Sequence, residues 1–148
     1  MKNSRRILRD YIPSDLESLA ILTTELGYPT TASEMEVRLK EISENQNCRT
    51  IVVEHDKQVV GFMGMTKNQS WENNGCFLRI QALVISANYR KLGVGKLLIE
   101  FAESFAREIN AKSIVLNCGN REERDSAHKF YVSVGFEAKS IGYKKSVL

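Results

Sequence analysis

The chain has 148 residues, of which 43% are hydrophobic and 26% are charged, and its formal net charge is +3. These proportions are typical of one soluble globular domain, and they exclude a low-complexity or largely disordered chain. No apolar run is long enough to cross a membrane, and the cations at the start are not followed by the apolar segment of a secretory signal. We therefore expect a single domain over residues 1–148, without a membrane partner and located in the cytoplasm.

Charge and cysteine usage point away from nucleic acid, metals and disulfides. The small positive charge suits a protein that binds a polyphosphate, but it does not imply nucleic acid. The N-terminal cations are Lys2, Arg5, Arg6 and Arg9. Apolar residues interrupt them, as in a strand with one solvated face. The three cysteines are widely separated and lack metal-ligand spacing, so we expect reduced, mostly buried thiols at Cys48, Cys76 and Cys118.

The N-terminal third predicts a strand followed by two helices. Residues 5–11 read as the strand, and a Ser14–Glu17 capping box starts a helix that Gly27 ends. A second box, Ser33–Glu36, opens an amphipathic helix that fades by Asn45.

The middle of the chain predicts a hairpin and a longer strand. Thr50–Glu54 and Val59–Thr66 are rich in β-formers and flank a turn-prone His-Asp-Lys segment. Gly61 and Gly64 interrupt the second strand, as residues at a bulge or at a close backbone approach would. A polar loop then leads to the run Phe77–Ser86, which alternates and then saturates with apolar residues like a strand buried partly on both faces.

The last third of the chain alternates helices and strands. The run that begins at Val94 carries apolar residues at helical spacing, with charged residues on the other side. In chain order we expect a helix over 94–109 capped by Asn110, a strand over 113–118, a helix over 125–134 ended by Gly135, and a last strand over 141–147.

The segment Tyr89–Gly95, with the sequence YRKLGVG, joins the strand before it to the helix that follows. At such a junction the first N–H groups of the helix lack carbonyl partners, and the helix dipole adds partial positive charge. Gly93 and Gly95 let the backbone approach an anion and take φ values that other residues resist, while Arg90 and Lys91 add cations. The segment therefore predicts a phosphate-binding loop.

Two well-known phosphate loops do not fit this segment. A Walker A loop needs Ser or Thr after its lysine, but Leu97 follows Lys96, and the first glycine of that motif is missing. The Rossmann fingerprint needs a third glycine where Leu98 stands, and no βαβ unit opens the chain. A different class of phosphate site is needed.

The pattern RxxGxG, formed by Arg90, Gly93 and Gly95, resembles the acyl-CoA pyrophosphate loop of the GNAT superfamily of N-acetyltransferases, which has the form Q/RxxGxG/A. The resemblance covers nearly the whole chain and implies an α/β fold with a mixed, mostly antiparallel central sheet of about seven strands flanked by about four helices. It also implies acetyl-CoA as the co-substrate. The residues expected to bind it are Leu83, Val84, Ile85, Arg90, Lys91, Leu92, Gly93, Val94, Gly95, Lys96, Asn117 and Asn120.

A second motif, AHKFYVSVGF at Ala127–Phe136, resembles the family's helix of the form Ax3Yx3GF. The resemblance implies that Tyr131 is the general acid that protonates the departing thiolate, a task that suits a phenol because its ordinary pKa of about 10 keeps it protonated at neutral pH. A structural interpretation stays open, because Phe130, Tyr131 and Val134 also lie on one apolar stripe, where a tyrosine is commonly a core residue.

Two positions depart from the family pattern. Where relatives often have an asparagine that contacts the pantetheine, this chain has Arg124, so that contact falls to Asn117 or Asn120, or Arg124 reaches a phosphate itself. Where many relatives carry a glutamate as the general base, the chain has Gln81, which cannot accept a proton. The base would then be a water chain or a carboxylate from elsewhere, with Glu72 as a candidate.

The resemblance implies acetyl transfer from acetyl-CoA to a primary amine of a small-molecule or peptide acceptor, by direct attack in a ternary complex, in a monomer or a homodimer. Trp71 is a candidate for lining the acceptor pocket, whereas His55 and His128 are expected at the surface and Cys118 is expected to be buried rather than nucleophilic. Two alternatives remain open: an acyl-CoA-binding or partner-binding module without turnover, which Gln81 favours, and a nucleotide-phosphate binder.

Overall fold

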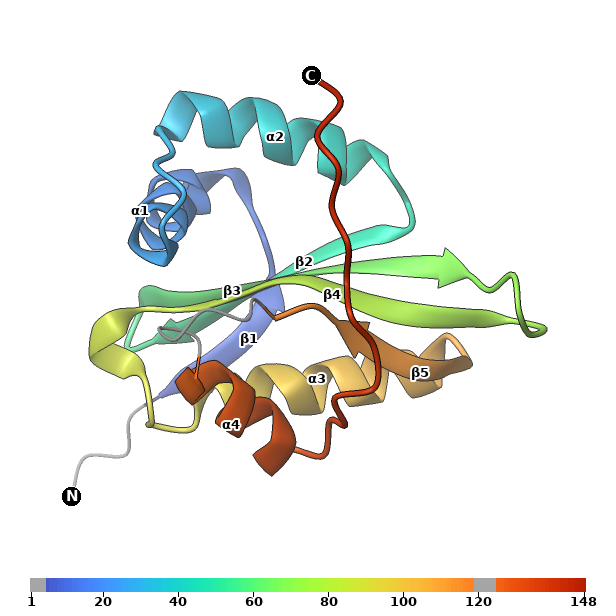
Figure 1. Cartoon of the computed structure of the whole chain (residues 1–148). Helices are drawn as coiled ribbons and strands as arrows, with labels where there is room; N and C mark the ends of the chain where they lie inside the picture. Colours follow the sequence, from blue (N-terminus) through green and yellow to red (C-terminus); the bar gives the residue numbers. More distant parts are fainter. Residues whose placement is uncertain (1–4, 119–124) are drawn as a thin grey trace. The chain divides into compact units, whose positions relative to one another are not determined.

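The first unit of the chain, Met1–Val115, is built around one five-stranded sheet (Figure 1). The strands lie in the order β1-β2-β3-β4-β5, and their bounds are β1 Arg6–Asp10, β2 Cys48–His55, β3 Gln58–Gln69, β4 Cys76–Ile85 and β5 Ala111–Leu116. β1 to β4 pair antiparallel in chain order. The computed structural model describes residues 5–118 and 125–148, and the second unit is Leu116–Leu148.

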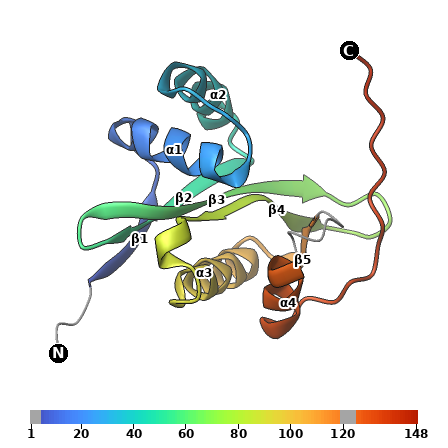
Figure 2. The same ribbon diagram turned by 60° about the vertical axis from the view of Figure 1, so that its left-hand side comes forward.

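Helices cover both faces of this sheet (Figure 2). α1 (Leu16–Leu26) and α2 (Ala32–Glu44) lie on one face, and α3 (Val94–Glu108) lies on the other. Two short 3-10 helices are η1 (Pro13–Asp15), before α1, and η2 (Ala87–Tyr89), after β4. The apolar stripe predicted for α3 is confirmed, because its buried residues are Val94, Leu98, Ile99, Ala102 and Ala106.

The core between the sheet and the first two helices anchors the end of β4. Its buried members are Leu19, Ala20, Leu22, Met35, Leu39, Val52, Phe62 and Val84. Burying a large aliphatic side chain of this kind stabilises the fold by about 1.5–3 kcal/mol. Val84 is 2% exposed, so the residue next to the last of β4 is fixed by packing, and the loop after this strand starts from a rigid point.

The predicted role of the two glycines in β3 is confirmed. A register shift beside Gly61 leaves Val60 as an extra residue of β3, and a shift beside Gly64 leaves Gln81 as an extra residue of β4. A Cβ on Gly61 would lie 3.0 Å from the carbonyl oxygen of Val84, which is tighter than nine in ten real Cβ contacts. The glycines therefore mark a bulge and a close backbone approach, both next to the end of β4.

The start of α1 differs from the predicted Ser14–Glu17 capping box. The turn η1 intervenes, and the carboxylate of Asp15 accepts the N–H of Ile12 at 2.9 Å. The same carboxylate accepts two hydrogen bonds of 2.8 Å from Arg9 and is 3% exposed. Because a charge-assisted pair of this kind is stronger than a neutral serine cap, the buried acid decides where the helix starts.

The capping box of α2 lies two residues before the predicted Ser33–Glu36. Thr31 is the N-cap: its hydroxyl accepts the N–H of Glu34 at 3.1 Å, and its own N–H donates to the Glu34 carboxylate at 3.0 Å. Ser33 lies inside the helix and is exposed. Two overlapping motifs fit the same rule, and the extended backbone of Thr31 selects the earlier one.

Replacing Thr31 with alanine should therefore lower the free energy of unfolding by about 1 kcal/mol, because it leaves the N–H of Glu34 without its acceptor. Replacing Ser33 with alanine is the matched control and should leave that free energy unchanged or raised by a few tenths of a kcal/mol, since alanine is the better helix former. Urea denaturation of both variants measures the difference. A larger loss for Ser33→Ala than for Thr31→Ala would contradict this position of the box.

The second unit contains the helix α4 (Asp125–Ser133) and a C-terminal segment without helix or strand. The strand predicted over 141–147 is wrong, and the mixed sheet has five strands in the described chain rather than about seven. The side chains that suggested this strand are exposed: Ile141 is 74% and Tyr143 is 93% accessible. Alternation of apolar and polar residues predicts that a strand would have one apolar face. A strand also needs a neighbouring strand to pair with its backbone, and the pattern alone does not supply one.

Candidate functional site

The loop between β4 and α3 has the geometry of an anion site. Gly93 is the N-cap of α3 and has a left-handed backbone with φ of 85°. The first hydrogen bond of the helix runs from the N–H of Leu97 to the carbonyl of Gly93, at 3.1 Å. The N–H groups of residues 94–96 therefore lie at the helix N-terminus without intrahelical partners. No acidic residue occupies the first turn of α3, so nothing there repels a phosphate.

The predicted unusual backbone at two glycines is confirmed for one of them. Gly93 is left-handed, but Gly95 lies inside α3, and the second left-handed residue of the loop is Lys91, with φ of 63°. Lys91 and Leu92 are exposed, with Leu92 51% accessible, while Val94 is buried and starts the stripe that packs on the sheet. The loop thus offers its backbone and its cations to solvent while its first helical residue anchors it.

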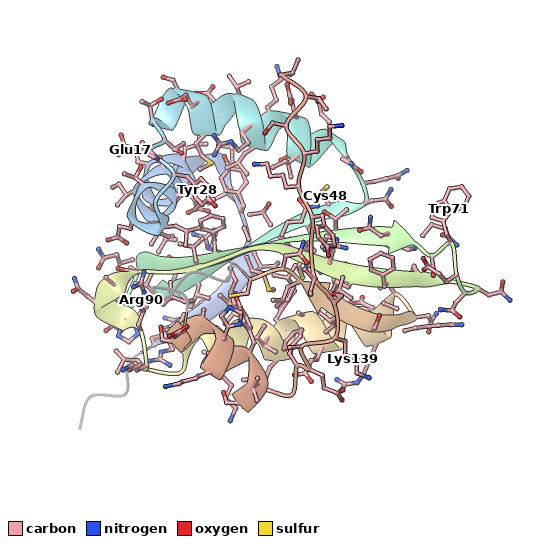
Figure 3. The ribbon with its side chains drawn as sticks, viewed as in Figure 1. Glu17, Tyr28, Cys48, Trp71, Arg90 and Lys139 are labelled. Carbon is pink, nitrogen blue, oxygen red and sulfur yellow. The ribbon has the colours of Figure 1, made fainter. Side chains whose placement is uncertain are left out.

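Two cationic side chains flank the loop. Arg90 is exposed and donates through Nε to the carbonyl of Ile85 at 3.3 Å, which holds the guanidinium at the end of β4 (Figure 3). Lys96 is exposed in the first turn of α3. Lys96 belongs to the same helix turn as the free N–H groups of residues 94–96, and Arg90 precedes these residues by four positions.

The three residues at the end of β4 are paired on one side. Leu83, Val84 and Ile85 lie opposite Met63, Phe62 and Gly61 of β3. The backbone N–H and C=O groups of β4 that bond to β3 are unavailable to a ligand. A pantetheine chain would therefore have to pair with the backbone groups of β4 that point away from β3. Gln81 is the extra residue of the bulge and is exposed, so its amide, not a carboxylate, stands at this position.

A cluster near the loop was not found from the sequence. Arg6 donates from Nε to Nδ1 of His55 at 3.3 Å, and the ring of His55 packs on that of Tyr89 with centroids 5.1 Å apart. His55 was expected in an exposed turn, but it is the last residue of β2 and its side chain is only 13% exposed. Strand pairing buries it, and the signal that could have found it is the register that sets Arg6 opposite His55.

The structure gives Trp71 and Glu72 no part in this loop. Both are exposed at the tip of the β3–β4 hairpin, and Trp71 is 98% accessible. They lie at the end of the sheet opposite Arg90 (Figure 3). β4 is 10 residues long, so at 3.3 Å per residue its two ends are about 30 Å apart. This position argues against Glu72 as the base.

Tyr131 belongs to the second unit, in the second turn of α4. Its ring contacts those of Phe130 and Phe136, with centroids 5.5 Å and 5.8 Å away, and the carbonyl of Tyr131 accepts the N–H of Phe136 at 3.0 Å. Gly135 is left-handed with φ of 100°, as predicted for the end of this helix. The tyrosine is half-buried, so both the catalytic and the packing interpretation fit its surroundings.

The remaining predicted residues are placed as follows. Asn117 is exposed just after β5, while Asn120 and Arg124 lie outside the described residues. His128, expected at the surface, is half-buried. Cys76 is buried, and Cys48 and Cys118 are half-buried.

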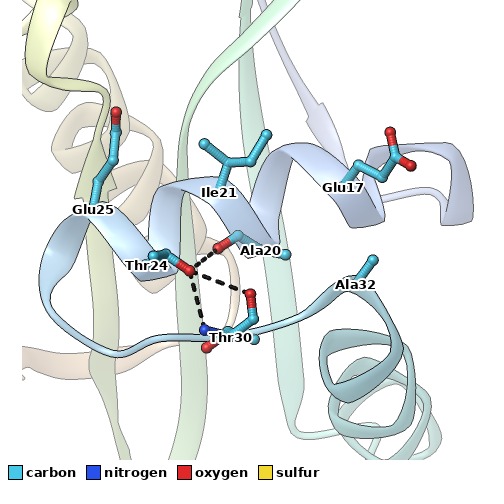
Figure 4. A pocket seen from close by; sticks show the side chains of 7 residues that line it. All are labelled: Glu17, Ala20, Ile21, Thr24, Glu25, Thr30 and Ala32. Atoms are coloured by element: carbon cyan, nitrogen blue, oxygen red, sulfur yellow. Dashed lines mark hydrogen bonds between the residues drawn. The ribbon is translucent and has the colours of Figure 1, made fainter.

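A pocket of about 410 Å³ lies beside α1, and none of the predicted site residues lines it (Figure 4). Apolar side chains of α1 and Ala32 form it, with the carboxylates of Glu17 and Glu25 at its rim. Its polar wall is already paired, because Thr24 Oγ1 donates to the carbonyl of Ala20 at 2.9 Å and accepts the N–H of Thr30 at 3.0 Å. In the described chain, the polar side chains of the pocket that have no hydrogen-bond partner are therefore the carboxylates of Glu17 and Glu25.

Residues 5–118 and 125–148 contain no cluster of three His, Cys, Asp or Glu side chains that could hold a metal ion. None of the helices in these ranges combines the length and the apolar character that crossing a bilayer requires.

Comparison with known proteins places this geometry in a family. The chain matches the Acetyltransferase (GNAT) family over residues 15–136, a range that includes β4, the loop and α4. A curated relative, the uncharacterized N-acetyltransferase YhdJ of Bacillus subtilis, is 34% identical over 76 residues, or 51% of this chain. The match covers 52% of YhdJ, so the chain spans about half the length of this relative.

Solved structures match over nearly the whole chain. A GNAT family acetyltransferase from Staphylococcus aureus is 32% identical with a TM-score of 0.83, and the match covers 96% of this chain and 98% of that one. Glucosamine-6-phosphate N-acetyltransferase from Arabidopsis thaliana shares the fold at 22% identity, with a TM-score of 0.79 and coverage of 96% and 98%.

A third structure, the aminoglycoside N-acetyltransferase AAC(6')-Iy in complex with CoA, shares the fold at 18% identity, with a TM-score of 0.81 and coverage of 99% and 98%. Because the family match spans most of the chain and a solved member superposes on nearly all of it, the chain belongs to the GNAT family of acetyltransferases.

Proposed function

We propose that this chain, as one domain over residues 1–148, transfers the acetyl group of acetyl-CoA to a primary amine by direct attack in a ternary complex. The observation that carries the proposal is the junction of β4 and α3, where a left-handed Gly93 leaves the N–H groups of residues 94–96 at a helix N-terminus without an acid nearby. This arrangement suits a diphosphate. The family match over residues 15–136 runs across both units and supports treating them as one domain.

The residues divide the work of binding between backbone and side chains. The N–H groups of the loop and the cations Arg90, Lys91 and Lys96 bind the diphosphate. The groups of Leu83–Ile85 that point away from β3 pair with the pantetheine amides, and Asn117 and Asn120 contact the same arm. A backbone N–H near Val84 polarises the thioester carbonyl, which places the acetyl group next to a residue that packing holds still.

The chemical step then needs one proton donor and one proton acceptor. The amine nitrogen attacks the carbonyl carbon, the C–S bond breaks, and the thiolate takes the proton of the Tyr131 hydroxyl. The ammonium form of the acceptor must lose a proton before attack. Gln81 cannot take it, so we assign that proton to a chain of waters that leads to solvent.

The acceptor is a small-molecule or peptide amine. Two proteins with this fold act on amines of small molecules by their names, glucosamine-6-phosphate in one case and aminoglycosides in the other. At 22% and 18% identity they support an amine as the acceptor class and no particular molecule. The protein is active in the cytoplasm, where acetyl-CoA is made and used.

A second candidate function is an acyl-CoA-binding module without turnover. The observation that favours it is the exposed Gln81 at the position where many family members carry their base. The experiment that separates the two measures thiol release from acetyl-CoA with pools of polyamines, aminoglycosides, amino acids and peptide N-termini. Acetyl-CoA binding in calorimetry without thiol release in any pool would favour the module, and tighter binding of ATP than of CoA would contradict both.

Replacing Gly93 with valine should weaken acetyl-CoA binding by at least about tenfold, because the side chain would stand where loop N–H groups meet phosphate. A non-glycine residue in this conformation costs about 1–2 kcal/mol, so the domain should stay folded. Isothermal titration calorimetry gives the affinity, and circular dichroism checks the fold.

The matched control is Gly75→Val. Gly75 also has a left-handed backbone, with φ of 101°, but it lies in the β3–β4 turn at the other end of the sheet. The control should lose similar stability and bind acetyl-CoA like the wild type. If folded Gly93→Val binds acetyl-CoA as tightly as folded Gly75→Val does, the phosphate-loop assignment is wrong.

A further inference from the structure

The loop has a cationic neighbour from the start of the chain. Arg6 of β1 lies opposite His55 of β2, and Gly61 of β3 lies opposite Ile85 of β4. The first residue of β1, the last of β2 and the last of β4 are therefore at the same end of the sheet, from which the loop leaves (Figure 1). Topology thus brings residue 6 to a loop more than 80 positions later in the sequence.

The guanidinium of Arg6 lies against Gly93. A Cβ built on Gly93 would stand 3.5 Å from Arg6 Nη1, so the cation faces the residue that starts α3. Only Nε of Arg6 has a partner, His55, among residues 5–118 and 125–148. The two terminal nitrogens, with four N–H donors between them, have no acceptor in the described chain.

We propose that Arg6 is a further phosphate-binding residue of the acyl-CoA site, with its terminal N–H groups donating to a phosphate oxygen of CoA. The proposal rests on the proposed function, because it takes the loop as the cradle of the diphosphate. A guanidinium offers paired donors that match a phosphate. CoA presents such oxygens in its diphosphate and in its ribose 3'-phosphate.

His55 acts as the positioning residue for Arg6. Its Nδ1 accepts from Arg6, its Nε2 lies 3.5 Å from Oδ2 of Asp56, and its ring rests on Tyr89. Because Arg6 Nε donates to it, Nδ1 is the acceptor nitrogen of the His55 ring, and Nε2 is the nitrogen that faces the carboxylate. Held at Nε, the Arg6 guanidinium loses less conformational entropy when it binds a phosphate.

The first test compares Arg6→Gln with Arg5→Gln. Arg5 is the exposed neighbour, so the two changes remove the same charge from adjacent positions. Calorimetry with CoA should show an affinity about five- to tenfold lower for Arg6→Gln, and within about twofold of wild type for Arg5→Gln. Dephospho-CoA identifies the phosphate: a deficit that persists assigns the diphosphate, and one that disappears assigns the 3'-phosphate.

The outcomes separate this inference from the proposed function. Wild-type protein that binds neither CoA nor acetyl-CoA would overturn both. Wild-type binding with an Arg6→Gln affinity that equals the wild-type value, or with equal losses in Arg5→Gln and Arg6→Gln, would overturn the Arg6 site alone. Arg6→Lys keeps the charge without the paired donors, so its affinity for CoA should lie between those of wild type and Arg6→Gln. This variant gives a second measurement if the glutamine variant folds poorly.

A double-mutant cycle tests the part played by His55. His55→Phe keeps a ring against Tyr89 and removes the acceptor for Arg6 Nε. It should weaken CoA binding about threefold alone and have no further effect in the Arg6→Gln background, since contacting residues are not additive. Independent, multiplying effects of the two changes would show that His55 does not act through Arg6.

Discussion

Replacing Asp15 with alanine is expected to lower the free energy of unfolding by about 3 kcal/mol, because it breaks a buried charged network at one partner. The carboxylate accepts two bonds from Arg9 and one from the N–H of Ile12. Arg9 keeps its bond to Glu54 and its side chain is 27% exposed, so the loss falls at the low end of the range for buried pairs. Urea denaturation at neutral pH measures it.

The control is Asp10→Ala, which also removes a carboxylate from an arginine. The Asp10 side chain is 63% exposed in its bond to Arg49, so its loss should be at most about 1 kcal/mol. Similar losses in the two variants would show that burial of Asp15 is not what makes its network strong.

The same network predicts a pH dependence. Burial raises the pKa of Asp15, but the hydrogen bonds from Arg9 and Ile12 and the positive charge of Arg9 together outweigh burial, so the pKa is below the usual value. A carboxylate with a lowered pKa stabilises the fold above its unfolded pKa of about 3.9, and that stability is lost as the pH falls further. The difference in the free energy of unfolding between wild type and Asp15→Ala should therefore become smaller from pH 7 to pH 3. A gap that widens in acid would contradict the sign.

Elements that depend on local interactions could be predicted from the sequence. The stripe of α3 repeats at helical spacing, and the ends of three helices coincide with residues that tolerate a left-handed backbone, Gly27, Asn110 and Gly135. The backbone geometry of the proposed phosphate loop belongs to the same class, because a strand, a glycine and a helix start are adjacent in the chain and need no distant partner.

Features that depend on a partner outside their own helix or strand could not be predicted. The first helix starts where Asp15 finds Arg9, and the segment at 141–147 alternates like a strand but has no paired backbone. His55 looks like a turn residue until the register sets it opposite Arg6. In the first and third cases a contact between two elements decides the structure, and in the second a strand partner is missing; the pattern of a single segment contains neither piece of information.

The candidate site divides along the same line. The proposed anion site around Gly93 follows from the local sequence, whereas the position of Arg6 beside it depends on the pairing of β1 with β2. The general base has no local signature, because Gln81 occupies the family's position and Glu72 lies at the wrong end of β4.

Replacing Tyr131 with phenylalanine should lower turnover by roughly 10²-fold or more, the usual contribution of one positioned proton donor. The ring would still pack against Phe130 and Phe136, so acetyl-CoA affinity and melting temperature should stay close to wild type. A packing role predicts the reverse pattern, with near-normal turnover and about 1 kcal/mol of lost stability from the hydroxyl's hydrogen bond.

The measurement is single-turnover thiol release with an acceptor found in the amine screen, so that chemistry and not product release limits the rate. Tyr143→Phe is the matched control, because it removes a hydroxyl from a tyrosine that is 93% exposed, and it should leave turnover and stability unchanged. If Tyr131→Phe keeps more than about half of the wild-type rate under these conditions, its hydroxyl is not the acid that protonates the thiolate. A large loss of rate at unchanged acetyl-CoA affinity and stability assigns the hydroxyl to the chemical step, since neither packing nor binding explains such a loss.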